Sequence, residues 1–294
     1  MKTRFSPTFA AAIAAAAVLM SLPSAALSET AKNQPAPSAE AVQKWPGIVV
    51  SVNASATVST QGMEPGGEIW GEWYLLPAGQ AVTEPATAAK WVYMEMPLDG
   101  TAVVTGDPTP MCGSGVRQAG PNDRTAASGD VEVCNYAVLP GSRTENKTAD
   151  PYVFAGLSVG GPWKEGMEDT GDLYRKVKGV AKSAHVTAAQ FAEVEKEILK
   201  AGEMRLSIRR ITLPPGGRLV TTDRYPTLRL VENGKLSFTL TEGSSAPAPK
   251  EIAASDTMEW DPANATKQVT LSNDAGEEVQ FIEWSVAPAQ SELP

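Results

Sequence analysis

The chain has 294 residues and a formal net charge of −9, with 34 acidic side chains against 25 basic ones. An acidic surface repels phosphate backbones and anionic lipids, so nucleic acid and membrane surfaces are excluded as expected partners. The single histidine leaves no material for a multi-histidine metal site within one chain.

The chain begins with the anatomy of a secretory signal peptide, which we place at residues 1–26. A short basic start precedes an apolar, alanine-rich run over residues 9–20, and small residues follow. This run is shorter than the ~20 apolar residues that span a bilayer, and no later stretch is long enough either. Cleavage after Ala26, or after Ser28, predicts a soluble periplasmic or secreted protein with no membrane insertion.

A polar leader and a β-rich unit follow. Residues 27–44 contain prolines and small polar residues, which predicts a flexible leader. Over residues 45–165, short β-prone runs alternate with turn residues, a spacing typical of a sandwich or barrel. The expected strands of this first domain are 47–52, 69–76, 90–96, 101–104, 131–138 and 152–159.

The two cysteines, Cys112 and Cys134, belong to a chain that we expect to be exported. Oxidising compartments let such pairs persist as disulfides, so we predict a Cys112–Cys134 bond worth roughly 3 kcal/mol in the chain-entropy model. The alternative, a reactive thiol or a metal-binding pair, has neither a CxxC spacing nor a nearby histidine to support it.

Residues 166–202 predict a helical connector, because the hydrophobic period changes there. We expect helices over 172–184 and 187–201. The second opens with Thr187-Ala188-Ala189-Gln190, a capping-box pattern, and ends before Gly202.

Strands return in a second domain over residues 203–294. They are expected at 205–213, 228–232, 235–241, 266–271 and 278–286. In the run 235–241, apolar and polar residues alternate strictly, which predicts one buried and one wet face.

The two β-rich segments contain an internal repeat. A strand from Gly67-Glu68 reaches Leu76-Pro77-Ala78-Gly79, and another from Gly202-Glu203 reaches Leu213-Pro214-Pro215-Gly216. Each is followed by a hydrophobic strand, a turn glycine (Gly100 or Gly234) and a further strand. Two copies of one β unit explain this pattern.

The second copy resembles the cupin family. Leu213-Pro214-Pro215-Gly216-Gly217-Arg218, continuing to Asn233-Gly234-Lys235, is similar to the first cupin motif. The stretch from Asp256 to Val279 is similar to the second. The resemblance covers residues 203–288, and 66–106 through the repeat. It implies a mostly β protein of two cupin-like antiparallel β-barrels joined by the helical connector.

The metal ligands of many cupins are missing from this resemblance. Where those cupins carry histidines, the second copy has Thr222 and Arg224, and the acid position falls near Leu228 or Arg229. The only histidine, His185, lies in the connector. We therefore expect no metal and no cofactor. His185 as a catalytic base, as in some metal-free cupin sugar epimerases, is the alternative to a polar residue at a helix junction.

Two groups of residues are candidates for ligand binding. In the first copy Trp91 and Tyr93 share a strand face, where they could stack on a sugar or apolar ligand or pack in the core. In the second copy Thr222, Arg224, Tyr225 and Arg229 gather where the family places its pocket, and arginines there could hold a carboxylate.

The acids Glu68, Glu72, Glu84 and Glu95 are too scattered to define a catalytic pair from sequence. No Ser-His-Asp set, phosphate-binding loop or HExxH helix is present.

Three functions fit the sequence. The first is an exported, metal-free, cupin-like binding or scaffold protein with a small-molecule or carbohydrate ligand. The second is a metal-free cupin enzyme, an isomerase or lyase acting on a sugar or small carboxylic acid. It would use Tyr225 or a glutamate to transfer a proton and Arg224 or Arg229 to hold the substrate. The third is a homo-oligomer formed through sheet packing.

Overall fold

The computed structural model describes residues 48–84, 90–106, 112–114, 117–118, 123–128, 130–136, 142–161, 170–242 and 248–291. The signal peptide and leader expected over 1–26 and 27–44 lie outside these residues. In the described part the protein is mostly β and all strand pairs are antiparallel. Within that part, no helix has the length and apolar character needed to cross a membrane.

In the described residues the strands form four sheets, and each half of the protein has an inner and an outer sheet. The first inner sheet is ordered β12 (Val180–Val186), β2 (Glu68–Leu76), β11 (Tyr152–Gly161), β4 (Lys90–Asp99), β9 (Glu132–Tyr136), β6 (Cys112–Ser114). The first outer sheet is ordered β3 (Ala81–Glu84), β10 (Ser142–Glu145), β5 (Thr101–Gly106), β8 (Asp123–Ala127), β7 (Arg117–Gln118).

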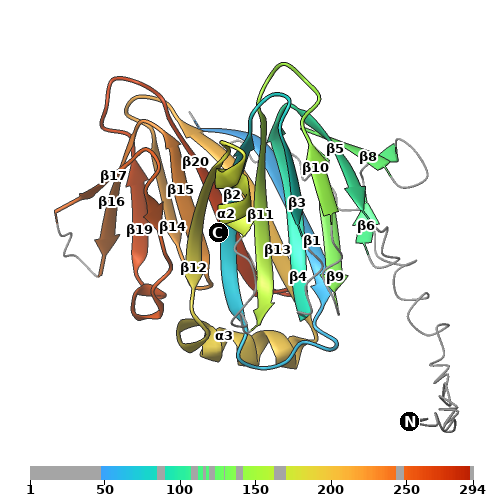
Figure 1. Ribbon diagram of the computed structural model, residues 1–294. Helices are drawn as coiled ribbons and strands as arrows, with labels where there is room; N and C mark the ends of the chain where they lie inside the picture. Colours follow the sequence, from blue (N-terminus) through green and yellow to red (C-terminus); the bar gives the residue numbers. More distant parts are fainter. Residues whose placement is uncertain are drawn as a thin grey trace, which may run out of the picture.

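The second half repeats this plan. Its inner sheet is ordered β1 (Val49–Ser59), β13 (Glu203–Leu213), β20 (Val279–Pro288), β15 (Thr227–Asn233), β18 (Thr257–Met258). Its outer sheet is ordered β14 (Arg218–Thr222), β19 (Gln268–Ser272), β16 (Lys235–Thr241), β17 (Lys250–Ala253). Figure 1 shows the outer strands of the two halves at opposite sides of the molecule.

Three hydrophobic cores hold these sheets together. The largest lies between the two inner sheets and contains Leu157, Leu206 and Trp284. Smaller cores fill the space between inner and outer sheet in the first half, around Phe154, and in the second half, around Phe281. No sheet in the described residues closes on itself, so the expected barrels are two-sheet sandwiches there.

The two halves exchange edge strands. β1, at the start of the expected first domain, pairs along its length with β13 of the second half. β12, in the expected connector, pairs with β2 of the first half. Each half therefore completes its inner sheet with a strand that lies outside its own repeat.

The helical connector predicted over 166–202 needs correction in its middle. α2 (Thr170–Lys176) ends before Lys178, which has a φ of 60°, and residues 180–186 form a strand instead of continuing the helix. Pairing with β2 overrides the weak helical period, because it buries Ala184 and Val186 in the core between the halves. The second predicted helix is confirmed as α3 (Ala188–Ala201), with the capping box between Thr187 and Gln190.

The internal repeat is confirmed by strand order and by a duplicated polar contact. Asn146, after β10, and Asn273, after β19, occupy the same place in their halves. The Asn146 Nδ2 group donates to the carbonyls of Leu76 and Asp150 at 3.0 and 2.8 Å. Asn273 Nδ2 donates likewise to Leu213 at 2.9 Å and to Glu277 at 2.7 Å. Each asparagine thus ties the end of one long inner strand to the loop before the next.

The predicted disulfide stays a prediction. The backbone register places Cys112 directly opposite Cys134 on β6 and β9. Opposite residues of antiparallel strands have Cα separations of about 4.5–5.5 Å, which a disulfide accommodates. The two side chains lie outside the described residues.

We expect Asn146→Ala and Asn273→Ala each to lower the free energy of unfolding by about 1–3 kcal/mol, because each leaves buried backbone carbonyls without a donor. Denaturant titration measures the change. Asn264→Ala is the matched control, since the Asn264 side chain bonds to the side chains of Asp261 and Lys267 and to no buried carbonyl among the described residues, and it should cost less than about 0.5 kcal/mol. Equal effects of all three variants would contradict this role.

Candidate functional site

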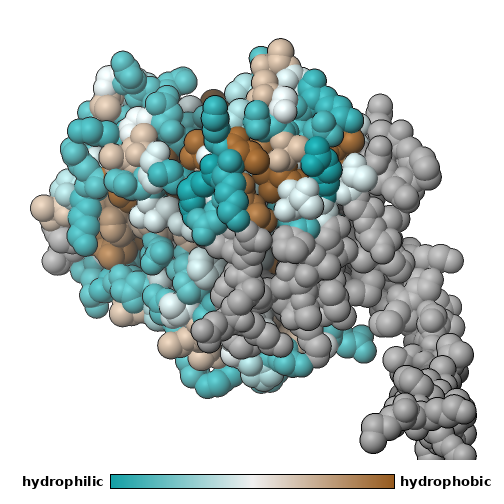
Figure 2. All heavy atoms as spheres, in the orientation of Figure 1, coloured by the Kyte–Doolittle hydropathy of each residue, from teal (hydrophilic) through white to brown (hydrophobic). Residues whose placement is uncertain are grey.

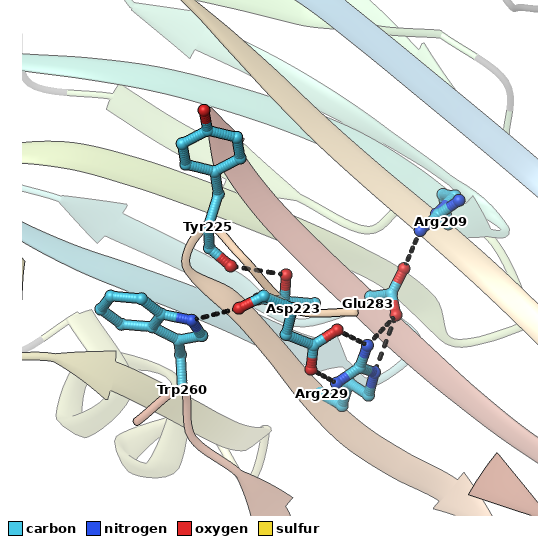
Figure 3. Close-up of polar contacts among 7 residues, drawn as sticks. Arg209, Asp223, Tyr225, Arg229, Trp260 and Glu283 are labelled. Carbon is cyan, nitrogen blue, oxygen red and sulfur yellow. Dashed lines mark hydrogen bonds and ion pairs between the residues drawn. The ribbon is translucent and has the colours of Figure 1, made fainter. Parts of the chain in front are cut away.

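The interior of the second half contains a buried ion-pair network (Figure 3). Arg229 on β15 donates from Nη1 and Nη2 to the Asp223 carboxylate at 2.5 and 2.8 Å. Its Nε donates to Glu283 Oε2 at 2.7 Å, and Arg209 Nη2 donates to Glu283 Oε1. All four side chains are buried, and Trp260 Nε1 closes the group by donating to the Asp223 carbonyl at 2.8 Å.

These partners balance one another's charge. Burial alone lowers the pKa of Arg229, but Asp223 and Glu283 raise it above its usual value. Burial alone raises the pKa of Glu283, but Arg209 and Arg229 hold it below its usual value. The network is therefore charged, its opposite charges compensate one another, and it lies in the same interior as the hydrophobic core around Phe281.

The second-copy candidates do not meet in one place. Arg229 points inward but is engaged by Asp223 and Glu283. Tyr225 belongs to the core between the halves, where its hydroxyl accepts a hydrogen bond from Ser291 Oγ at 2.9 Å. Thr222 and Arg224 are exposed. The guanidinium carbon of Arg224 lies 5.2 Å from the centre of the Tyr225 ring.

The interior of the first half has a different polar group, which we call the acidic cluster: Glu72, Glu84, Glu95, Tyr74, Tyr93, Tyr152 and Tyr174. Its acids come from β2, β3 and β4, and all three keep part of their surface exposed. Side chains alternate between sheet faces along a strand. Glu72 and Tyr74 therefore share the face of β2 that looks toward the outer sheet.

Hydrogen bonds connect the acids to the tyrosines. Tyr74 donates to Glu72 Oε1 at 2.6 Å. Tyr93 and Tyr152 donate to the two oxygens of Glu95 at 3.2 and 3.3 Å. All three glutamates raise the pKa of Tyr93, after burial, which places its hydroxyl within electrostatic reach of the whole set. Tyr93, a candidate from sequence, is thus the centre of the cluster.

Glu84 is a strongly perturbed acid of the cluster. Burial, then the charges of Glu95 and Glu72, raise its pKa to about 8. Burial and neighbouring acids also raise the pKa of Tyr74 and Tyr174. Carboxyl groups kept protonated near neutral pH are frequent at functional sites.

A second aromatic group continues the same face of β2. His185 on β12 stacks on Trp70, with ring centres 3.8 Å apart, and its Nε2 lies 3.3 Å from Glu68 Oε2. Glu68, Trp70, Glu72 and Tyr74 therefore form one row along the strand. His185 belongs to a strand here, where sequence placed it at a helix junction.

Register shows how the two interiors correspond. In the first half Gly156 on β11 pairs with Glu72 on one side and Glu95 on the other. In the second half Glu283 on β20 pairs with Arg209 and Arg229 at the same places. A Cβ added to Gly156 would lie 2.9 Å from the Tyr93 hydroxyl, so that hydroxyl takes the space above the glycine.

The sequence analysis considered Glu72, Glu84 and Glu95 as candidate acids. It did not predict that they lie close together, because they come from separate strands. The signal available was the repeat, which aligns Glu72 with Arg209 four residues before Leu76 and Leu213. The Trp91 side chain, the other aromatic candidate, lies outside the described residues.

Among the described residues, no group of three or more histidine, cysteine, aspartate or glutamate side chains is placed to hold a metal ion. The Glu72, Glu84 and Glu95 side chains interact electrostatically without forming such a set.

Comparison with known proteins gives distant structural likenesses. No protein-family model matches the chain, and no curated protein matches its sequence. The chain is similar to Bacillus subtilis oxalate decarboxylase, with 12% identity and a TM-score of 0.47 over 80% of this chain and 72% of that one. It is similar to Microcystis aeruginosa AerE, with 10% identity and a TM-score of 0.43 over 86% and 98%. For a formate complex of Lactobacillus farciminis oxalate decarboxylase the values are 12% and 0.46 over 90% and 86%. At these values the likeness carries no argument about function.

We expect Glu283→Gln to lower the free energy of unfolding by about 3–5 kcal/mol at neutral pH, because it leaves Arg209 and Arg229 buried with too little negative charge. The folded-state pKa of Glu283 is lowered, so its contribution is present above the unfolded pKa and is lost as pH falls through the folded one. Glu193→Gln, at an exposed pair with Lys196, is the matched control and should change stability by less than about 1 kcal/mol. A loss no greater than the control's would refute the role.

Glu84→Gln should raise the free energy of unfolding, whereas Glu283→Gln lowers it. The folded state keeps the Glu84 proton up to a pKa of about 8, whereas the usual value is 4.5. Ionisation therefore favours unfolding as pH rises through this window, and glutamine cannot ionise. We expect the variant to gain stability relative to the natural protein from about pH 4.5 to pH 8. Thermal unfolding at several pH values tests this, with Glu145→Gln on neighbouring β10 as the matched control. A constant difference across the window would contradict the burial of Glu84.

Proposed function

We propose that this protein is an exported, metal-free, cupin-like binding protein whose first half takes up a small polar ligand at the acidic cluster. The periplasm or the extracellular space is the proposed location, on the strength of the leader sequence. The cupin assignment is supported by the two sequence motifs and by the repeated pairs of facing antiparallel sheets.

The observation that carries this proposal is the difference between the two interiors. In the second half Arg229 and Glu283 satisfy each other and their neighbours, so that interior serves as support. In the first half, partly exposed acids and buried tyrosines gather around Tyr93, whose pKa all three acids raise. Convergent polar groups beside aromatic rings are typical of small-molecule sites.

A sugar or another hydroxyl-rich or amino-bearing molecule suits this site. Carboxylates accept hydrogen bonds from hydroxyl and amino groups, while tyrosines donate them and offer ring faces for stacking. A small carboxylic acid suits it poorly, because the charges of Glu72 and Glu95, which raise the pKa of Glu84, repel an anion. The arginine-based carboxylate site expected from sequence has no support from the placement of Arg224 and Arg229.

The second candidate function is a metal-free enzyme, an isomerase or lyase acting on a sugar. It is favoured by Glu84, whose pKa of about 8 suits a group that exchanges a proton near neutral pH. In this role Glu84 acts as the acid or base, and Tyr93 polarises the substrate. Chemical change of a bound sugar during incubation, abolished in Glu84→Gln, distinguishes the enzyme from the binding protein.

Native mass spectrometry of the mature protein, isolated from its own compartment, tests the binding function. We expect a non-protein mass that is lost or weakened about tenfold in Tyr93→Phe and in Glu95→Gln, since each removes a polar contact of the cluster. The same spectrum reports the number of copies in the assembly.

Arg224→Ala is the matched control, because it removes the exposed second-half candidate and leaves the acidic cluster intact. It should keep the ligand. Loss of the ligand in Arg224→Ala alone would move the site to the second half. A natural protein that carries no added mass, and that no fraction of its compartment's extract stabilises against heat, would overturn the binding function.

A further inference from the structure

The one asparagine–glycine pair of the sequence, Asn233-Gly234, lies at a corner between two sheets. Asn233 ends β15 of the second inner sheet, and after Gly234 the chain enters β16 of the outer sheet. Gly234 has a φ of 81°, and a Cβ there would lie 3.0 Å from Val279 Cγ2 and 3.1 Å from the Glu278 carbonyl oxygen. Glycine meets both demands because it has no side chain. The fold itself therefore places glycine after Asn233.

The Asn233 side chain is loosely held. It is exposed, and no hydrogen bond to its amide is found among the described residues. A register shift between Val231 and Asn233 interrupts the ladder between β15 and β20 at this point. Such an irregularity constrains the end of a strand less than a regular ladder does. The amide is therefore free to turn back toward the main chain.

We propose that Asn233 is the preferred site of spontaneous deamidation in the described part of this protein, with the main-chain nitrogen of Gly234 as the nucleophile. Hydroxide takes the proton of the Gly234 N–H, and the nitrogen forms a bond to Asn233 Cγ. The Cγ–Nδ2 bond breaks, and ammonia leaves with a proton from water. One water molecule then opens the resulting succinimide ring at either carbonyl carbon, which leaves aspartate or isoaspartate at this position. The net reaction exchanges water for ammonia, and nothing is oxidised or reduced.

Three other asparagines are held away from this reaction. Asn146 and Asn273 are buried, and their amides donate to backbone carbonyls. The Asn264 amide bonds to two neighbouring side chains, and the next residue is Ala265, whose Cβ hinders attack by the main-chain nitrogen. Asn233 differs from all three in having both a free amide and a following glycine.

The repeat offers a comparison within the same chain. The first half has an aspartate–glycine pair, Asp99-Gly100, at the corresponding turn glycine. Arg210 Nη1 donates to Asp99 Oδ2 at 2.8 Å, and a carboxylate held in an ion pair is a poor electrophile. A Cβ at Gly100 would lie 2.4 Å from the Pro151 carbonyl oxygen, so this turn is also closely packed. The same corner is thus chemically stable in one half and reactive in the other.

Deamidation changes the protein where both charge and main-chain length matter. Each event adds a negative charge next to Glu232, whose carboxylate accepts hydrogen bonds from Arg210 and from Trp73 of the first half. Isoaspartate also lengthens the main chain by one methylene group beside the closely packed Gly234. The modification therefore falls next to a polar contact between the two halves.

Peptide mapping of the mature protein, aged in its folded state at neutral pH and physiological temperature, tests the inference. Trypsin releases residues 230–235 as one peptide, and deamidation raises its mass by about 1 Da. We expect Asn233 to convert at least about tenfold faster than Asn264, and within about tenfold of the rate in a synthetic peptide of residues 230–235. Anion-exchange chromatography of the intact protein should show a more acidic form that accumulates at the same rate.

Asn233→Gln is the matched variant, because glutamine must close a larger ring to react in the same way. It should keep both the peptide mass and the chromatographic position through the ageing period. The comparison with the synthetic peptide uses the natural protein, so it decides the matter even if this variant fails to fold. A protein rate more than about a hundredfold below the peptide rate would show that the fold protects Asn233 and would overturn the inference. Conversion of Asn264 as fast as Asn233 would overturn it as well.

Discussion

The compensation of buried charge is the constraint on which the rest of this structure depends. A charge enters the space between two sheets only with partners, because desolvation of a single ion costs several kcal/mol. In the second half, Arg229 lies between Asp223 and Glu283, and Glu283 between Arg209 and Arg229. These contacts span β13, β15 and β20, so they also fix the register of the second inner sheet.

The same inner sheet supports the first half. β1, which precedes the first half in the sequence, is an edge strand of the second inner sheet. β12, which precedes the second half, is an edge strand of the first inner sheet. The face opposite the ion pairs packs against the first inner sheet, where Trp284 lies against Gly71 so closely that an added Cβ would be 2.7 Å from its ring. Arg210 adds polar contacts across this boundary, to Asp99 of the first half and Glu232 of the second. The two inner sheets therefore share one tightly packed boundary that also carries polar contacts.

Local signals in the sequence predicted much of the fold. Turn glycines such as Gly79 and Gly216, both with positive φ, and the capping box at Thr187 act within a few residues, so pattern reasoning found them. The strand β12 was missed because only its partner β2 decides its conformation. The exchange of β1 was missed for the same reason, since pairing between residues 49 and 212 leaves no local trace. Tyr93 was found from strand alternation. The sequence did not predict that the acids around it form one cluster. They meet because the strand order brings β2, β3 and β4 to one interior, and no single motif indicates that order.

The two halves differ in how their buried charges are compensated, and this difference bears on stability. A frame made of two copies can keep the charges of one interior compensated and use its rigidity to hold the other in a less favourable state. Three carboxylates around one tyrosine hydroxyl repel each other, and Glu84 takes up a proton in response. Such a cluster persists only when surrounding strands fix its geometry, which here they do through Asn146 on one side and the shared core on the other.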